Sequence, residues 1–305
     1  MDLDWPGLVA TYNNGTNIST YLSSNYPDLS LDQIIEITYT IQAGSYVQIA
    51  KDNNLFMAKR AEAMLRKPLI DVLDSSNLIL DCGTGELTSL VQLLRAYPLK
   101  SQILAYDGSL PRLIHGRAYA KEYADPCIQN IRLFCGDSTL IPIASKSIDC
   151  CMSIHAIEPN GCQVNQILKE LSRVSKEWVV LVEPIYELAD SSQRARMDSL
   201  GYAKGILRAL SLYGLEIVYQ YPLEHFSGNL LNKSHLIIAR HLSVSTITRS
   251  PSYTCPVTNS CLSQFGPYLG GRNTPWSYPI FRNIPILKKG NGILTGPIYS
   301  FKASK

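Results

Sequence analysis

The chain has 305 residues, of which 46% are hydrophobic and 17% charged, with 28 Lys and Arg against 25 Asp and Glu. A chain of this length and composition buries a sizeable core, which excludes general disorder and collagen-like or coiled-coil architectures. The net charge of +3 is not the basic excess of a dedicated nucleic-acid binder, so nucleic acid is not expected as a partner. No apolar stretch approaches about 18 residues, so no membrane span is expected.

Targeting and cysteine features favour a cytoplasmic location. The sequence begins without a basic segment ahead of an apolar one, so we expect no signal peptide. Eight cysteines are scattered without any C-x-x-C pair, and the adjacent Cys150 and Cys151 stand in an apolar run. Buried, unpaired cysteines of this kind predict reduced thiols.

The N-terminal quarter shows two expected helices after an irregular arm. Residues 1–29 have little periodicity. Ser30 opens a capping box of the form S-x-x-Q, and apolar residues follow at helical spacing as far as Gly44. A second helix is expected over 52–66, with Pro68 ending it or starting the next turn. We expect residues 1–74 to form an arm and a helical cap.

From residue 78 onward, short apolar runs alternate with longer helical stretches. The expected strands are Leu78–Cys82, Gln102–Asp107, Ile131–Cys135, Ile148–Ile154 and Trp178–Glu183. The expected helices between them cover residues 86–97, 109–123 and 164–174. This alternation predicts an α/β fold in which a parallel sheet carries helices on both faces.

The last third of the chain predicts a change of architecture. One long helix is expected from Ser191 to Gly214, followed by strands over Leu215–Tyr221 and Ser234–Arg240. The short connection between these strands requires them to be antiparallel to each other. Residues 242–305 are rich in turn-forming residues, so we expect a central domain over 75–241 and a small C-terminal module over 242–305.

The most informative segment is the turn Asp81-Cys82-Gly83-Thr84-Gly85, which follows the first expected strand. Its glycines let a ligand approach the backbone, and the next helix offers free N–H groups. Sites for dinucleotides and for S-adenosylmethionine use this arrangement. Thr88 stands where the dinucleotide pattern G-x-G-x-x-G needs its last glycine, and Asp81 can attract an ammonium group. S-adenosylmethionine therefore fits better.

Three further segments complete a family pattern. Asp107-Gly108-Ser109 ends the second strand, Gly136-Asp137-Ser138 starts the loop after the third, and Ser147-Ile148-Asp149 opens the fourth. With the glycine turn, they resemble class I S-adenosylmethionine-dependent methyltransferases over about residues 75–240. The resemblance implies a Rossmann-like sheet of seven strands, the last one antiparallel, with an N-terminal helical cap and a small C-terminal appendage.

The resemblance also implies S-adenosyl-L-methionine as the cofactor and assigns its contacts. The expected cofactor-binding residues are Asp81, Gly83, Gly85, Asp107, Gly108, Asp137, Ser138 and His155. The glycines would admit the methionine part, Asp107 would hold the ribose, and Asp137 with Ser138 would meet the adenine edge. His155, just past the fourth strand, would face the sulfonium and the substrate.

Methyl transfer from a sulfonium is an in-line displacement, so the protein mainly supplies alignment and a water-poor pocket. A hydroxyl or protonated amine acceptor also needs a base. His155, Glu158 and Glu183 follow the fourth and fifth strands, and His155 is the first choice because it titrates near neutral pH. Tyr46 stands where a lid edge would point at the pocket. Packing roles for His155 and Tyr46 remain open, and no acidic cluster suggests a metal.

The tail carries a second resemblance. Cys255-Pro256-Val257-Thr258 and the later run that begins Tyr278-Pro279-Ile280 resemble small zinc-ribbon-like modules, which accompany some methyltransferases and RNA-modifying enzymes. Thr258 stands where the second ligand is expected, and residues 262–277 contain neither Cys nor His. A tetrahedral structural site needs four such ligands, so we expect a degenerate, metal-free module.

The leading hypothesis is a biosynthetic transferase that methylates an oxygen or nitrogen of a small-molecule or carbohydrate-type acceptor. The low net charge and the tyrosines of the N-terminal arm favour it, because aromatic hydroxyls line pockets for polar small molecules. Two alternatives stay open: an RNA methyltransferase, which the tail suggests, and a non-catalytic methyltransferase-like interaction protein. A homodimer is also left open.

Overall fold

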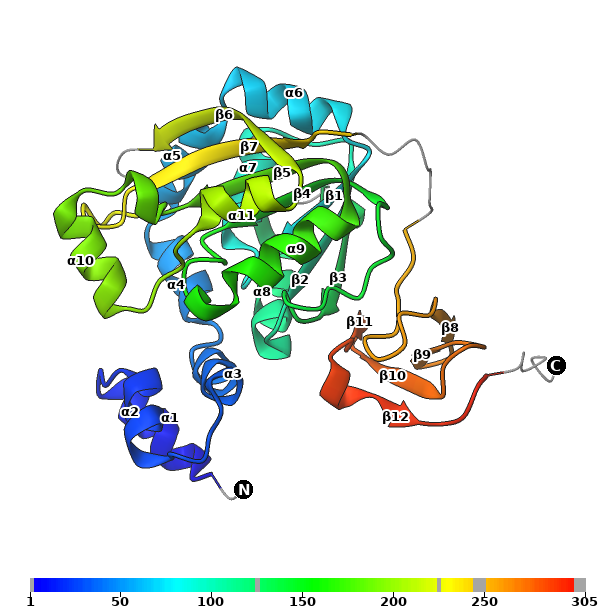
Figure 1. Ribbon diagram of the computed structural model, residues 1–305. Helices are drawn as coiled ribbons and strands as arrows, with labels where there is room; N and C mark the ends of the chain where they lie inside the picture. The colour runs from blue at the N-terminus through cyan, green and yellow to red at the C-terminus, as the bar shows by residue number, and fades with distance from the viewer. Residues whose placement is uncertain (1–2, 124–126, 224–225, 244–250, 299–305) are drawn as a thin grey trace.

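A seven-stranded sheet forms the centre of the computed structural model, which describes residues 3–123, 127–223, 226–243 and 251–298 (Figure 1). The N-terminal helices α1, α2 and α3 lie at one end of the molecule, and a small C-terminal sheet lies beside the edge strand β3. The described part of the chain has no helix with the length and apolar character needed to cross a membrane.

The strand order of the central sheet is β3-β2-β1-β4-β5-β7-β6. The strands are β1 (Leu78–Cys82), β2 (Gln102–Asp107), β3 (Ile131–Cys135), β4 (Ile148–Ile154), β5 (Ser175–Glu183), β6 (Leu215–Leu223) and β7 (Ser234–His241). Strands β1 to β5 pair in parallel, whereas β7 is antiparallel to both β5 and β6. The predicted Rossmann-like α/β fold is confirmed, and β1 to β4 have the predicted bounds.

Helices cover both faces of this sheet. One face packs against α5 (Asn54–Met64), α6 (Lys67–Ser75), α7 (Thr88–Ala96) and α8 (Leu110–Tyr123), and the other against α9 (Val164–Val174) and α11 (Ile206–Leu212). Burial on both faces explains why every residue of β1 is buried and why the strand reads as one apolar run. In α9, Ile167, Leu168 and Leu171 recur at helical spacing and turn inward.

The N-terminal arm is helical, so the prediction of an irregular segment over 1–29 is wrong for its described residues. It contains α1 (Trp5–Asn13) and α2 (Ile18–Asn25), followed by α3 (Leu31–Ile41) and α4 (Ser45–Asp52). Asp4 and Asn17 cap the first two helices by accepting backbone N–H groups. Leu8, Ile18 and Leu22 then pack with α3 in a small separate core, a contact that short weakly periodic segments do not reveal.

The helix expected over 52–66 is α5, within two residues at each end, and Pro68 starts the next helix, α6. Another predicted helix is broken. The helix expected over 191–214 consists of α10 (Ser191–Ser199) and α11, because Gly201 and Gly205 adopt left-handed φ angles of 64° and 81°. Glycine adopts these angles without strain, so the chain turns there.

The C-terminal module is a small antiparallel sheet. Its strands are β8 (Ser263–Phe265), β9 (Tyr268–Gly270), β10 (Trp276–Phe281), β11 (Ile284–Pro285) and β12 (Ile293–Leu294). Leu269, Tyr278 and Leu287 are buried in the same core as α9 and β4. The Leu287 N–H also donates to the Cys135 carbonyl at 2.7 Å, so the module is bound to the edge of the main sheet.

The inward face of α9 generates a test of the packing. Leu168→Ala removes a fully buried side chain and is expected to lower the free energy of unfolding by about 2–5 kcal/mol. Lys169→Ala, at the neighbouring exposed position, should change it by less than about 0.5 kcal/mol. Urea denaturation of both variants measures the difference, and equal effects would contradict the packing of α9 on the sheet.

Candidate active site

The turn after β1 brings the backbone close to two other segments. Gly83 and Gly85 have φ angles of 67° and 57°, which favour glycine. A Cβ at Gly83 would lie 2.4 Å from the Cβ of Ala156, and a Cβ at Gly85 would lie 2.4 Å from Nη2 of Arg112. Gly83 is confined by the fixed Cβ of Ala156, whereas at Gly85 the movable end of the Arg112 side chain would have to shift. The turn therefore packs against the loop after β4 on one side and against α8 on the other.

Two carboxylates lie beside this turn at the ends of neighbouring strands. Asp107 accepts the N–H groups of Gly85 and Ser109, both at 2.9 Å, and both Asp81 and Asp107 are buried. Burial, with the nearby charge of Asp107, raises the pKa of Asp81 to about 6. A cation beside Asp81 would therefore be stabilised.

The residues present fit a polar ligand with an ammonium group and ribose hydroxyls. Beside the two carboxylates, Ser109 Oγ and Arg112 Nε are buried and have no hydrogen-bond partner among the described residues. Buried polar atoms are costly without partners, so a ligand with hydroxyl or carboxylate groups would satisfy them. The predicted cofactor residues Asp81, Gly83, Gly85 and Asp107 thus lie together at the carboxyl ends of β1 and β2, hereafter the crevice, which is where α/β sheets of this kind bind ligands.

The two residues predicted for the adenine edge lie on the loop after β3. The carboxylate of Asp137 accepts the backbone N–H and the hydroxyl of Thr139, each at 2.7 Å. Ser138 Oγ accepts the hydroxyl of Tyr106 at 3.2 Å. Because β1, β2 and β3 are parallel, their carboxyl ends meet at one edge of the sheet, which places this loop beside Asp107.

Arg112 occupies the centre of the crevice and was not predicted from the sequence. Its guanidinium lies between the rings of Tyr39 and Tyr46, at 4.7 and 4.8 Å from their centroids. It also approaches Glu86 at 3.9 Å and Asp107 at 3.7 Å. Tyr46 therefore contacts a side chain of this region, although 42% of the residue stays exposed.

A buried carboxylate attaches the N-terminal cap to the turn. Glu86 accepts the backbone N–H of Gly44 at 2.9 Å and that of Val47 at 2.7 Å, and it is 1% exposed. Gly44 has a φ of 99° and starts α4, so both donors belong to the open first turn of a helix. The cap is thereby held over the crevice, with Tyr39 and Tyr46 on its inner side.

The predicted catalytic residues His155 and Glu158 are in contact after β4. His155 Nδ1 lies 3.4 Å from Glu158 Oε2, and His155 Nε2 lies 2.6 Å from the hydroxyl of Ser234. His155 has a φ of 53°, an uncommon conformation for a non-glycine residue, which the surrounding contacts hold. The arrangement resembles a base whose ring is oriented by an acid.

Glu183, the third candidate base, has a supporting position instead. Its carboxylate accepts N–H groups from Ala156, Ile157 and Glu158 and the hydroxyl of Ser153. Burial, together with the nearby Glu158 charge, raises its pKa. With its oxygens directed at this backbone, Glu183 fixes the loop that carries His155.

The cap-side tyrosines connect the two halves of the site. Tyr39 lies within electrostatic reach of Tyr46, Arg112, Asp107 and Glu158, and burial raises its pKa. Burial and then Glu158 likewise raise the pKa of Tyr202. The geometric link between the two halves is the glycine turn, because Gly83 packs against Ala156, the residue after His155.

The C-terminal module also reaches this region. Lys288 Nζ forms an ion pair with Glu36 of α3 at 2.7 Å and donates to the carbonyl of Gly108 at 3.4 Å. Gly108 directly follows Asp107, so one side chain joins the module, the cap and the proposed ribose loop. Glu86 could have been recognised from its place after the glycine turn, whereas nothing in the sequence brings Lys288 to this site.

The raised pKa of Asp81 predicts pH-dependent ligand binding. An ammonium group needs the ionised carboxylate, which is lost below about pH 6, so S-adenosylhomocysteine should bind about tenfold more weakly at pH 5.0 than at pH 7.5. Asp81→Asn should bind weakly and without this pH dependence, whereas Glu216→Gln, an exposed control on β6, should behave like the parent chain. Titration calorimetry measures both, and equal parent affinities at the two pH values would contradict this role.

The ion pair and the hydrogen bond of Lys288 predict a smaller effect on cofactor binding, separate from that of Asp81. Lys288→Met removes the ion pair and the contact with Gly108, and a partly exposed pair of this kind corresponds to about a two- to fivefold higher Kd for S-adenosylhomocysteine. Lys289→Met alters the adjacent exposed lysine and serves as the control. The same loss in both variants, or none in either, would show that the module does not support the ribose loop.

Comparisons with known proteins agree with the fold of the central domain. Residues 79–177 match the methyltransferase domain family. No curated protein sequence matches the chain. Among solved structures, a chain of the Haloferax volcanii complex between the Trm112 methyltransferase activator and a putative methyltransferase has a TM-score of 0.50 at 15% identity, covering 67% of this chain and 96% of that chain.

Two other similar structures have lower scores. The magnesium protoporphyrin IX methyltransferase from Synechocystis PCC 6803 has 12% identity and a TM-score of 0.49, covering 63% of this chain and 87% of that chain. The geranyl diphosphate C-methyltransferase from Streptomyces coelicolor A3(2) has 15% identity and a TM-score of 0.46, covering 60% and 79%. At such identities the likeness concerns the fold. With the domain match, the chain carries a class I methyltransferase domain and is an S-adenosylmethionine-dependent methyltransferase.

Proposed function

We propose that the enzyme methylates an oxygen or nitrogen of a small polar acceptor, of small-molecule or carbohydrate type, beneath the N-terminal cap. The observation that carries this proposal is the His155–Glu158 pair beside the glycine turn. The cap that Glu86 holds covers this edge of the sheet, which favours a small acceptor over a long polymer. Tyr39, Tyr46 and Tyr202 supply aromatic faces and hydroxyls, which suit polar small molecules and sugars.

The proposed cofactor contacts follow from the charge of the buried carboxylates and from the buried polar atoms that have no hydrogen-bond partner among the described residues. Asp81 would hold the ammonium group. Each carboxylate oxygen of Asp107 accepts one backbone N–H, from Gly85 or Ser109, and would accept a ribose hydroxyl with its remaining lone pair. Asp137 and Ser138 would meet the adenine edge, with Gly108 beside the ribose. Arg112 now lies over Gly85, so we propose that it moves aside, still between its two tyrosines, when the methionine part enters.

When bound, S-adenosylmethionine supplies an electrophilic methyl group, and the chain supplies alignment, exclusion of water and a proton acceptor. With Nδ1–H donated to Glu158, Nε2 of His155 is the basic nitrogen, and the buried hydroxyl of Ser234 fixes the ring. In this tautomer the Ser234 hydroxyl already donates to Nε2, so the acceptor would have to displace that hydroxyl before Nε2 could take its proton. Glu158 would stabilise the imidazolium that results.

Other finer assignments rest on supporting observations. We propose the division into a cap over 1–74, a catalytic domain over 75–241 and a module over 242–305. We propose that the module is a metal-free zinc-ribbon-like unit, and the surroundings of Cys255 support this. Its thiol has hydrogen bonds with Thr258, Thr274 and Tyr278 in place of a metal ion. Burial alone would raise the pKa of this thiol, but these hydrogen bonds lower it overall. A cytoplasmic, biosynthetic role is supported by the unpaired thiols of the described cysteines.

The base assignment has a direct test. Incubation of the chain with methyl-labelled S-adenosylmethionine and a panel of sugars, phenols and amines should label a small acceptor. His155→Asn should lower that rate by about 10²–10⁴-fold, while binding of S-adenosylhomocysteine stays within about threefold. Glu158→Gln should lower the rate less and shift its pH profile, and Glu216→Gln should leave both unchanged.

Two results would reject this proposal. Labelling of RNA with no labelling of any small acceptor would show that the acceptor is RNA and not a small molecule. Full activity of His155→Asn at every pH would show that His155 only packs beside the cofactor.

A further inference from the structure

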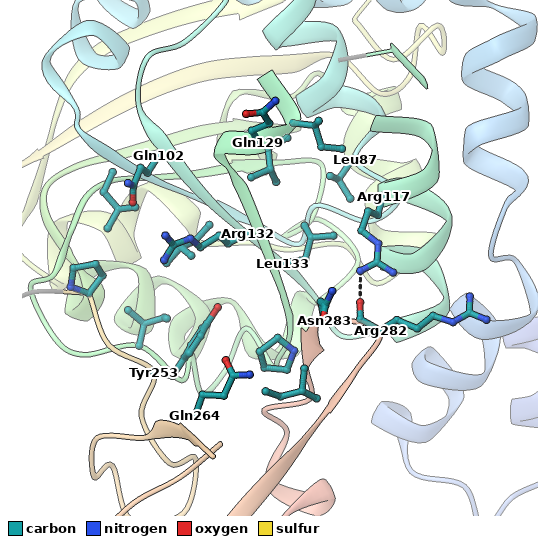
Figure 2. A pocket seen from close by; sticks show the side chains of 18 of the residues that line it. Leu87, Gln102, Arg117, Gln129, Arg132, Leu133, Tyr253, Gln264, Arg282 and Asn283 are labelled. Carbon is teal, nitrogen blue, oxygen red and sulfur yellow. Dashed lines mark hydrogen bonds between the residues drawn. The ribbon is translucent and has the colours of Figure 1, made fainter. Parts of the chain in front are cut away.

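A cavity of about 880 Å³ lies along the outer edge of β3, between that strand, α8 and the C-terminal module (Figure 2). It is separate from the crevice at the glycine turn, and the proposed methyl transfer does not use it. We propose that this cavity, hereafter the β3-edge groove, binds an acidic, extended peptide segment of a partner protein, which adds a strand to β3.

The backbone of β3 offers the hydrogen-bonding groups for such a strand. The N–H of Gly136 donates to the Asp107 carbonyl, toward β2, whereas the Cys135 carbonyl accepts from Leu287 on the outer side. Alternate residues of a strand direct their N–H and C=O groups to opposite sides. Leu133 and Ile131 therefore direct theirs outward, as Cys135 does. No backbone hydrogen bond joins them to a described residue on that side, but β11 already lies beside the end of β3, so the free part of the edge is at Ile131.

The C-terminal module already begins this pairing. Ile286 forms a parallel bridge with Cys135, the last residue of β3, and Pro285 lines the groove. The edge of β3 is thus used at its carboxyl end and open toward Ile131. A peptide that continues the ladder from this point would gain main-chain hydrogen bonds of the kind seen in strand addition.

The charge of the groove sets the chemistry of the peptide. Arg117 and Lys121 come from α8, Arg132 from β3 and Arg282 from the module, and no described lining residue is acidic. None of the four forms an ion pair with a described residue. Arg117 donates to the carbonyl of Arg282, and Figure 2 shows their side chains on the same side of the cavity.

This pair of cations lacks a counterion. Burial, followed by the charge of Arg282, lowers the pKa of Arg117. A carboxylate between the two guanidinium groups would remove this repulsion and form charge-assisted hydrogen bonds. Apolar groups line the groove on both faces of β3: the half-buried Ile128 packs in the cluster on the α8 side, and the half-buried Tyr253 packs in the other cluster. A bound strand would therefore meet apolar groups as well as cations.

A peptide suits the groove better than single-stranded nucleic acid does. Sites for single strands stack successive bases on several aromatic side chains, and Tyr253 alone among the described lining residues is aromatic. The remaining alternative is that the cations protect the edge strand, since charged residues there also keep copies of a chain from pairing. Binding measurements distinguish the peptide, nucleic-acid and edge-protection hypotheses.

The test uses the full chain and a fluorescein-labelled peptide of alternating glutamate and valine, followed by fluorescence anisotropy. We expect micromolar binding that weakens with salt, and at least about tenfold weaker binding of a twin in which lysine replaces glutamate. The double variant Arg117→Glu, Arg282→Glu should lose at least about tenfold in affinity. Arg208→Glu, an exposed control on α11 without ion pairs to described residues, should stay within about twofold.

A second variant tests the strand edge itself. Ile131→Pro removes an outward N–H at the first residue of an edge strand, where proline is tolerated, and also removes a side chain that packs on the core. Ile131→Ala loses the same packing but keeps the N–H, so it is the matched control. The proline variant should bind the acidic peptide more weakly than Ile131→Ala, while both bind S-adenosylhomocysteine as the parent chain does, which also separates this test from that of the proposed function. Peptide binding by Ile131→Pro equal to that of Ile131→Ala would overturn strand addition.

Other outcomes overturn the proposal as a whole. Equal binding of the two peptides, or none of either, would reject an acidic peptide. Displacement of the peptide by oligouridylate at lower concentration would make the groove a nucleic-acid site. Self-association of the double variant, with no peptide binding by the parent chain, would show edge protection alone.

Discussion

Asp81 and Asp107 are buried carboxylates at the carboxyl ends of adjacent parallel strands, with the guanidinium of Arg112 near them. Removing a carboxylate from water costs free energy unless charge or hydrogen bonds compensate, and Asp81 shows the cost as a raised pKa. The parallel sheet imposes this arrangement, because it brings the strand ends together at one edge. The enzyme maintains a charged, partly unsatisfied crevice that would suit a cationic, hydroxyl-bearing cofactor.

The other parts of the chain close and support that crevice. Glu86 holds the first turn of α4, which brings Tyr39 and Tyr46 onto Arg112. From the opposite direction, Lys288 of the C-terminal module reaches both α3 and the loop beside Asp107. The terminal segments thus meet at the site from the two ends of the sequence, and the module does so by adding a short strand contact to β3.

Much of the central fold is encoded locally. Short apolar runs bounded by turns gave correct bounds for β1 to β4, and the glycine turn identified the crevice, since both depend on residues adjacent in sequence. Residues 5–25 were mistaken for an irregular arm because their helices are stabilised by packing on α3. Gly201 and Gly205 were not recognised as a helix break, although their left-handed angles require it.

The candidate site was predicted in part for the same reason. Asp107, His155 and Glu158 follow strands directly, so their meeting at one edge is a consequence of topology. Arg112 and Lys288 depend on contacts between distant segments, and the role of Glu183 as a loop anchor rather than a base depends on the backbone after β4. Such contacts have no local signal.

A crystal structure of the chain with S-adenosylhomocysteine tests the central claim most directly. The amine is expected within hydrogen-bond distance of Asp81, both ribose hydroxyls on Asp107, and the Arg112 side chain displaced from Gly85. Density for the ligand outside this crevice, or none at all with Arg112 still against Gly85, would contradict the account.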